Sequence, residues 1–218
     1  MCNRARFTLR HVLHVYEAAS PRAALVLGHG AGAGQYSSFM VRVGRALAEG
    51  GVSVATFDFP YITAGRKVPD RTPVLEGTWR AAIEAARQRF TALPLFIGGK
   101  SMGGRIASHV AADRSAGRIA GLVFFGYPLH PPGKPQQRRD AHLSAIAEPM
   151  LFVQGGNDTF GSGDEIRVLL PRLQRATLHE VRGGDHSLKV LARDRSGDVD
   201  PLEAAIEAAR EWMLKRVD

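Results

Sequence analysis

Short apolar runs alternate along this chain with longer stretches in which apolar residues recur at helical spacing. A first strand is expected near the N-terminus, where apolar positions include Phe7, Leu9, Val12, Leu13 and Val15. Six further runs are typical of buried strands, and they cover residues 24–27, 52–57, 95–97, 122–125, 150–153 and 178–181. Strands that alternate with helix-length segments indicate βαβ units. The pattern predicts an α/β protein with a doubly wound, mostly parallel sheet of six or seven strands flanked by helices.

Capping residues mark the expected helices between these runs. Ser38 is placed to cap one helix, and a Thr-Pro pair at residues 72–73 opens another. Asp200 precedes Pro201 and lies three residues before Glu203, a spacing that predicts a capping box at the start of the last helix. Between these signals the chain shows no internal repeat, so we expect residues 1–218 to form a single domain.

Residues 127–149 interrupt the pattern because they are rich in proline and polar residues. They follow the end of a predicted strand and are expected to form an irregular segment that overhangs the active site. The sheet pattern continues beyond them, which disfavours a domain linker.

Charge and cysteine content narrow the choice of partners and compartment. The net charge is +8, with 24 Arg against 5 Lys, but the basic residues are scattered along the chain. Scattered charge disfavours nucleic-acid binding and is compatible with an anionic small-molecule substrate.

Cys2 is the only cysteine, so no intrachain disulfide can form and the cytoplasm is the simplest location. No apolar run approaches the roughly 18 residues that a membrane span requires, and no membrane partner is expected. Oligomeric state stays open.

The segment Gly99-Lys100-Ser101-Met102-Gly103 allows two interpretations. The first is the end of a phosphate-binding loop, which needs a glycine five residues before Gly99. Position 94 holds proline, and the intervening residues resemble a strand. The second is the sharp strand-to-helix turn that presents a serine nucleophile between two glycines. The strand at 95–97 and the helical pattern after Gly103 favour the second interpretation.

A serine nucleophile needs a base and a carboxylate that orients the base. In this architecture the order along the chain is serine, acid, histidine, each on a loop that follows a strand. Ser101, Asp158 and His186 fit that order and are the predicted catalytic residues. Asp164 is the nearest rival for the acid. His130 and His142 are rivals for the base, because both lie in the overhanging segment.

The negative oxygen of an acyl-transfer intermediate needs main-chain N–H donors. Met102 follows the nucleophile and supplies one. The second is expected from Ala31, with Gly32 as the alternative, because the glycine-rich loop after the strand at 24–27 brings main chain close to the substrate. Candidate substrate-binding residues are Gly30, Gly32, Lys100 and Tyr127, and Lys100 and Arg105 flank the nucleophile with positive charge.

The same glycine-rich loop raises a different function. Residues 28–33 satisfy a loose dinucleotide-binding fingerprint, and Asp58 ends the following strand where a ribose-binding acid would lie. Such a fingerprint should open a helix at once, whereas residues 34–37 prolong the loop. A nucleotide-dependent oxidoreductase is therefore the less favoured alternative.

Six motifs together resemble the α/β-hydrolase fold, in a compact branch similar to dienelactone hydrolases. They are GHGAGAG, FDFPY with GRKVPD, GGKSMGGR, YPLHPPGKP, QGGNDTFG and GGDHSL, and they extend from Gly28 to Leu188. Dienelactone hydrolases use a cysteine nucleophile, where this chain has Ser101. The resemblance implies a serine hydrolase mechanism without metal or cofactor. We expect cleavage of an ester or related acyl bond of a small soluble substrate; the alternative is a catalytically silent binding module of the same fold.

Overall fold

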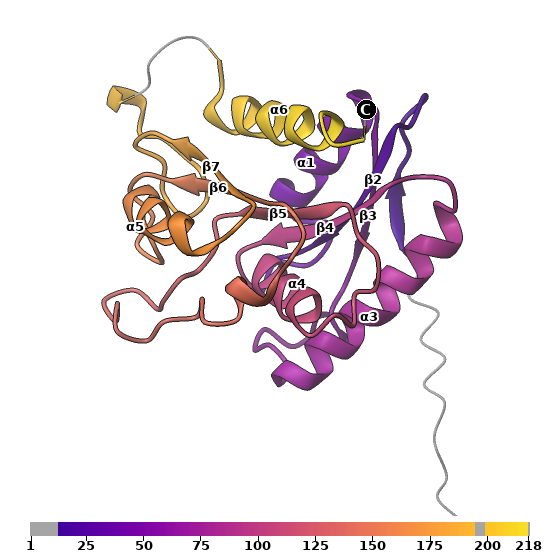
Figure 1. Ribbon diagram of the computed structural model, residues 1–218, viewed down its shortest axis with the longest axis horizontal. Helices are drawn as coiled ribbons and strands as arrows, with labels where there is room; N and C mark the ends of the chain where they lie inside the picture. Colours follow the sequence, from indigo (N-terminus) through magenta and orange to yellow (C-terminus); the bar gives the residue numbers. More distant parts are fainter. Residues whose placement is uncertain (1–12, 195–198, 218) are drawn as a thin grey trace, which may run out of the picture.

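Seven strands form one sheet in the computed structural model, which describes residues 13–194 and 199–217 (Figure 1). The strand order across the sheet is β1-β3-β2-β4-β5-β6-β7. β1 is antiparallel to β3, and every other neighbouring pair is parallel. The mostly parallel sheet is therefore confirmed. The strands are β1 (His14–Tyr16), β2 (Ala23–Gly28), β3 (Val52–Phe57), β4 (Leu95–Lys100), β5 (Gly121–Phe125), β6 (Met150–Gly155) and β7 (Ala176–Val181).

Helices cover both faces of the sheet, because its strands carry apolar side chains on both faces. Figure 1 shows α1 (Ser38–Glu49) and α6 (Pro201–Leu214) on one face and α3 (Thr72–Arg89) and α4 (Met102–Ala112) on the other. Each face has its own apolar core, with Trp212 on the α6 side and Trp79 on the α3 side. The short elements are α2 (Pro60–Thr63), α5 (Gly163–Leu169) and the 3-10 turns η1 (Leu143–Ala145), η2 (Leu170–Arg172) and η3 (Ala192–Asp194).

The helix starts differ in detail from the sequence prediction. Ser37, not Ser38, is the N-cap of α1, and its side chain makes no capping hydrogen bond. Asp200 caps α6 by accepting from two main-chain N–H groups. Glu203 does not complete the predicted capping box, because its carboxylate accepts from Arg42 Nε at 2.6 Å. An ion pair with α1 thus replaces the local contact.

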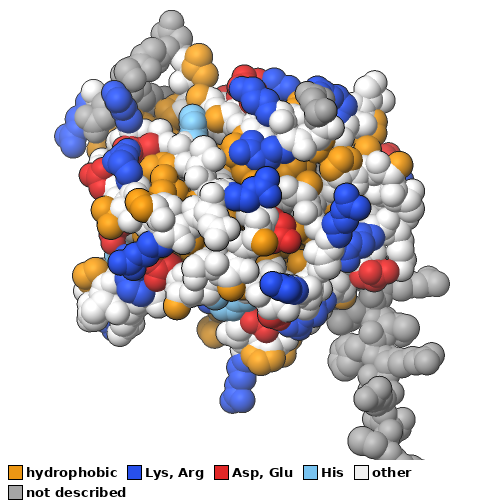
Figure 2. Space-filling model, in the orientation of Figure 1, with side chains coloured by type: hydrophobic (Ala, Val, Ile, Leu, Met, Phe, Trp, Pro, Cys, Tyr) orange, Lys and Arg blue, Asp and Glu red, His pale blue; other side chains and the backbone are white. Residues whose placement is uncertain are grey.

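The expected first strand lies mainly outside the described residues. Its C-terminal part is present as β1, which pairs with β3 through His14, Val15 and Tyr16. No helix in the described part of the chain has the length and apolar character needed to cross a bilayer. On the face seen in Figure 2, Lys and Arg side chains are dispersed among other residues, which matches their scattering along the chain.

The parallel strands end at a common edge of the sheet, and this edge gathers the predicted site. The loop 29–37 follows β2, Ser101 follows β4, and residues 126–149 follow β5. Asp158 follows β6 and His186 follows β7. Ligand sites of open α/β sheets lie outside the carboxyl ends of the strands. Five segments that are far apart in sequence therefore meet where chemistry is expected.

Candidate active site

Ser101 occupies a strained turn between β4 and α4. Its φ of 50° and ψ of −115° lie outside the regions that residues with a side chain ordinarily adopt. The Ser101 N–H donates to the carbonyl of Phe125 at 3.1 Å, which ties the turn to the neighbouring strand. The backbone strain holds the hydroxyl above the sheet edge, as the motif predicts.

The glycines on either side of Ser101 are required by close packing. A Cβ at Gly99 would lie 2.3 Å from the carbonyl oxygen of Gly28, and a Cβ at Gly103 would lie 2.2 Å from the same atom. Both distances are far below van der Waals contact. The strand-turn-helix unit can therefore pack against β2 only with glycine at these two positions.

The ring of His186 lies within hydrogen-bond distance of the other two predicted catalytic side chains. His186 Nε2 lies 2.8 Å from Ser101 Oγ, and His186 Nδ1 lies 2.8 Å from Asp158 Oδ2. An ionised carboxylate can only accept, so Nδ1 carries the hydrogen and Nε2 is free to accept from the Ser101 hydroxyl. This arrangement can transfer the serine proton to the imidazole.

Asp158 is buried and held in place from several sides. Its Oδ1 accepts from the Phe160 N–H at 2.8 Å, and its Oδ2 accepts from Gln154 Nε2 at 2.8 Å. The rival Asp164 is exposed and pairs with Arg167 instead. Gln154, at the end of β6, is a supporting residue that the sequence reasoning missed, since a buried glutamine in a strand carries no distinctive motif.

The imidazole of His186 is fixed by an aromatic ring and by a lysine. The Phe160 ring stacks on it, with the centroids 4.2 Å apart and the planes at 29°. Lys100 Nζ donates to the His186 carbonyl oxygen and lies 5.7 Å from the centroid of the Phe39 ring. Burial lowers the pKa of Lys100 to about 8, although the charges of Asp158 and Asp185 oppose that shift. Lys100 therefore contacts the main chain of His186 rather than projecting into solvent.

The glycine-rich loop after β2 places main chain beside Ser101. A Cβ at Gly30 would lie 3.8 Å from the Ser101 Cβ. The Gly32 N–H already donates to the Tyr61 hydroxyl at 3.0 Å. Among the described residues, the N–H groups of Ala31 and Met102 have no hydrogen-bond acceptor. These two groups, and not Gly32, are available to an oxyanion.

His29 shapes this loop and is a second residue that the sequence reasoning missed. Its Nδ1 lies 2.7 Å from the Gly30 carbonyl oxygen, and its Nε2 accepts from the Phe59 N–H at 3.3 Å. One nitrogen donates and the other accepts, which requires a neutral ring. Burial lowers the pKa of His29, in keeping with that form. His29 therefore links the loop after β2 to the segment after β3.

A cavity of about 570 Å³ opens in front of Ser101. Residues 127–149 contribute Pro128 and Arg139 to its wall, so the segment borders this cavity. Tyr127 does not line the cavity. It is fully buried, and its hydroxyl donates to the Arg139 carbonyl oxygen at 2.9 Å. The remaining wall residues include Gly30, Ala31, Phe39, Lys100, Met102, Arg105, Phe160 and His186.

The rival histidines have structural partners of their own. His130 Nε2 lies 2.9 Å from Glu165 Oε1, and His142 Nε2 lies 2.7 Å from Ser108 Oγ. Neither histidine lies at the cavity wall. Among the described residues, no group of three or more histidine, cysteine or acidic side chains is placed to share a metal ion.

Comparison with known structures supports the same architecture. A serine hydrolase homologue from Coxiella burnetii superimposes with a TM-score of 0.69 at 15% identity, covering 93% of this chain and 89% of that one. A dienelactone hydrolase from Anabaena variabilis gives 0.68 at 19% identity, with 93% and 90% covered. Est1E from Butyrivibrio proteoclasticus, solved with bound ferulic acid, gives 0.67 at 17% identity, with 94% of each chain covered.

A protein-family model described as an alpha/beta hydrolase domain matches residues 21–214. These residues include every strand except β1 and all the loops at the edge where the parallel strands end. That match spans most of the chain and agrees with the fold of the structural neighbours. The chain therefore belongs to the alpha/beta hydrolase domain family.

Proposed function

We propose that this protein is a serine hydrolase that cleaves an ester or related acyl bond of a small substrate through an acyl-enzyme. The observation that carries the proposal is the continuous relay from Ser101 Oγ through the His186 ring to Asp158, with both contacts at 2.8 Å. The relay ends in an open cavity, and two unoccupied main-chain N–H groups lie beside it. Together these are the components that acyl transfer needs.

In the first half-reaction Ser101 Oγ attacks the acyl carbon while its proton moves to His186 Nε2. Asp158 stabilises the imidazolium that forms, and the Ala31 and Met102 N–H groups donate to the oxyanion of the tetrahedral intermediate. Loss of one such donor typically lowers turnover about a hundredfold to a thousandfold. His186 then gives its proton to the leaving group, and the acyl group stays on Ser101.

In the second half-reaction a water molecule replaces the leaving group. His186 accepts a proton from the water, whose oxygen attacks the acyl carbon. Collapse of the second intermediate returns the His186 proton to Ser101 and releases the acid. The segment 127–149 covers the cavity with only two wall residues, which favours small substrates over long lipids.

Hydrolysis of short p-nitrophenyl esters by the purified chain tests the proposal. We expect turnover of the acetate and butyrate esters to exceed that of long-chain esters, and we expect Ser101→Ala to abolish it. Ser144, an exposed serine of η1, provides a matched control, and Ser144→Ala should retain turnover. A folded protein that neither hydrolyses these esters nor reacts with a fluorophosphonate would contradict the proposal and favour a silent binding module.

A further inference from the structure

Two arginines in the wall of the catalytic cavity lack a carboxylate partner. Arg105 and Arg139 both line the cavity. Among the described residues, no carboxylate oxygen lies within ion-pair distance of either guanidinium. Burial lowers the pKa of Arg105, and the charge of Arg139 lowers it further against the effects of Tyr127 and Glu76. Two arginines without a carboxylate partner thus share a partly buried wall, an arrangement that an anion would stabilise.

The acidic residues of this region cannot supply that anion, because each already has another cation. The pairs are Asp70 with Arg66, Glu76 with Arg80, and both Asp140 and Glu165 with Arg138. Asp70 is the one carboxylate among the wall residues, whereas the wall carries Lys100, Arg105 and Arg139 as cations. The cavity in front of Ser101 is thus positively charged.

The main chain fixes both arginines relative to the nucleophile. Arg105 lies one helical turn after Ser101, and its N–H donates to the Ser101 carbonyl at 3.0 Å. Side chains of a helix tilt toward its N-terminus, so Arg105 leans toward the reacting end of α4. Arg139 is anchored on both sides: its N–H donates to Leu129 O at 2.8 Å, and its carbonyl accepts from the Tyr127 hydroxyl.

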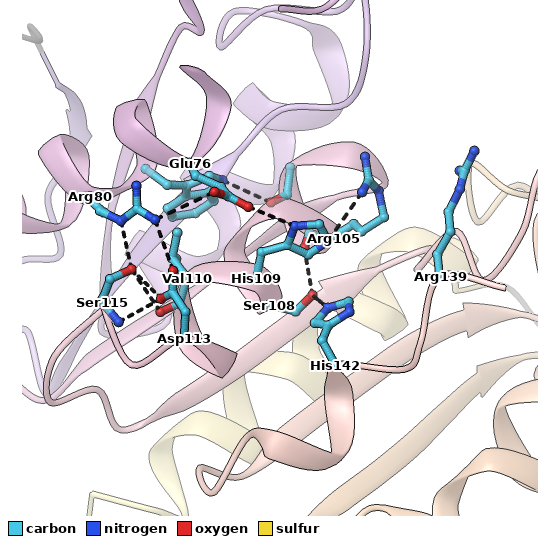
Figure 3. Close-up of polar contacts among 12 residues, drawn as sticks. Glu76, Arg80, Arg105, Ser108, His109, Val110, Asp113, Ser115, Arg139 and His142 are labelled. Carbon is cyan, nitrogen blue, oxygen red and sulfur yellow. Dashed lines mark hydrogen bonds and ion pairs between the residues drawn. The ribbon is translucent and has the colours of Figure 1, made fainter. Parts of the chain in front are cut away.

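A partly buried polar cluster fastens the segment that carries Arg139 onto α4 and α3. Ser108 Oγ contacts His142 Nε2 at 2.7 Å, the rings of His142 and His109 meet edge to face at 4.4 Å, and His109 Nδ1 lies 3.1 Å from Glu76 Oε1. Arg105 belongs to this cluster, since its Nη1 lies 3.4 Å from His109 Nε2, and Figure 3 shows the side chains of Arg105 and Arg139 extending to the same side of the Ser108–His142 contact. The cluster therefore positions the Arg105 side chain and the segment that carries Arg139, and both arginines line the cavity.

We infer that Arg105 and Arg139 form a subsite for a carboxylate on the substrate, so that the enzyme prefers acyl esters with a free carboxylate over neutral esters of the same length. This inference rests on the proposed function for the hydrolysis step. Binding of a carboxylate at Arg105 and Arg139 does not depend on that step. Guanidinium groups bind carboxylates through paired, charge-assisted hydrogen bonds, which a neutral ester cannot replace.

Kinetics with a matched pair of substrates test this inference. The p-nitrophenyl monoester of glutaric acid is compared with the p-nitrophenyl methyl diester of the same acid. We expect the ratio of their kcat/KM values to fall about tenfold or more in Arg139→Met and in Arg105→Met, and to recover in part in Arg105→Lys. Lys134→Met removes a positive charge from the same segment, at an exposed residue that does not line the cavity. That control should keep the wild-type ratio.

Binding measured without turnover separates this inference from the proposed reaction. In the Ser101→Ala background, calorimetry with monomethyl glutarate, dimethyl glutarate and inorganic phosphate should show preference for the monoanionic carboxylate, lost on Arg139→Met. If hydrolysis is absent but this preference holds, the reaction fails and the subsite stands. Three results would overturn the subsite. In calorimetry these are equal binding of the two glutarate esters or tighter binding of phosphate. In kinetics it is a kcat/KM ratio of the two p-nitrophenyl esters that stays unchanged in Arg105→Met and Arg139→Met.

Discussion

Among the described residues two serine–histidine contacts of nearly equal length occur, and only one has the surroundings proposed here for catalysis. Ser101 lies 2.8 Å from His186 at the sheet edge, and Ser108 lies 2.7 Å from His142 between α4 and η1. Figure 3 shows the second pair. Ser101 lines a cavity, whereas Ser108 is fully buried.

The direction of the hydrogen bonds separates the pairs further. The Ser108 hydroxyl donates to the Arg105 carbonyl at 2.6 Å, so His142 Nε2 must be the donor to Ser108 Oγ. A nitrogen that carries its proton cannot act as the base. Burial, together with the charges of His109 and Arg105, lowers the pKa of His142 to about 4. His186, in contrast, donates to Asp158 and accepts from Ser101. A serine–histidine distance alone therefore does not define a nucleophile.

The largest expected difference between the pairs is in turnover. Ser101→Ala should lower kcat by at least about a thousandfold, because the covalent step is lost. Ser108→Ala removes a buried hydroxyl that takes no part in the relay. It should leave the Ser101 relay competent and instead lower the free energy of unfolding by about 1–3 kcal/mol, because the N–H of His142 loses its acceptor. Ester kinetics and urea denaturation of both variants measure the two effects.

The carboxylate that contacts His186 provides the next test. Asp158→Asn should lower kcat about a thousandfold to ten-thousandfold, because an amide favours the wrong tautomer of His186. Asp164→Asn is the control: it is the sequence rival, but it is exposed and pairs with Arg167. The kcat for ester hydrolysis at pH 8 distinguishes the Asp158→Asn and Asp164→Asn variants. Equal losses in both variants would contradict the assignment of Asp158.

Lys100 should give the catalytic region a pH dependence of stability. Its folded pKa is about 8, whereas an unfolded lysine titrates near 10.5. Between these values the unfolded state binds more protons, so stability rises with pH, by up to about 3 kcal/mol. Denaturation of wild type and Lys100→Met between pH 7 and 10.5 measures the difference, with the exposed Lys189→Met as control. A wild-type curve that parallels Lys100→Met would be contrary to this expectation.

The Ser108–His142 pair should show a pH dependence of the same sign, in a more acidic range. His142 has a folded pKa of about 4, below the 6.5 of a free histidine. As the pH falls through this range the unfolded state gains the proton first, so stability declines below pH 6.5. His142→Gln should flatten the curve between pH 6.5 and 4. Denaturation midpoints in that range, compared with wild type, provide the check.

Much of the fold was predictable from sequence because buried parallel strands are continuous apolar runs. The six predicted runs all lie within strands, and the glycines around Ser101 mark a turn whose close packing admits no side chain. The order of Ser101, Asp158 and His186 also follows from the position of each residue after a strand. These signals are local, so one sequence suffices to read them.

The missed features depend on contacts between distant segments. Tyr127 follows β5, where a pocket residue is expected, but its ring turns inward to pack on Phe124 and Phe152. The scaffold role of His29 depends on the Phe59 N–H, and the Gly32 N–H is satisfied by Tyr61. No local pattern in the sequence encodes such pairings.

The most direct measurement is the site of a covalent adduct. The folded wild-type chain is treated with a fluorophosphonate, digested and mapped by peptide mass spectrometry. We predict one adduct, on Ser101, that persists in Ser108→Ala and disappears in Ser101→Ala. An adduct on Ser108 or another residue, or unmodified Ser101 in folded protein near pH 8, would contradict it.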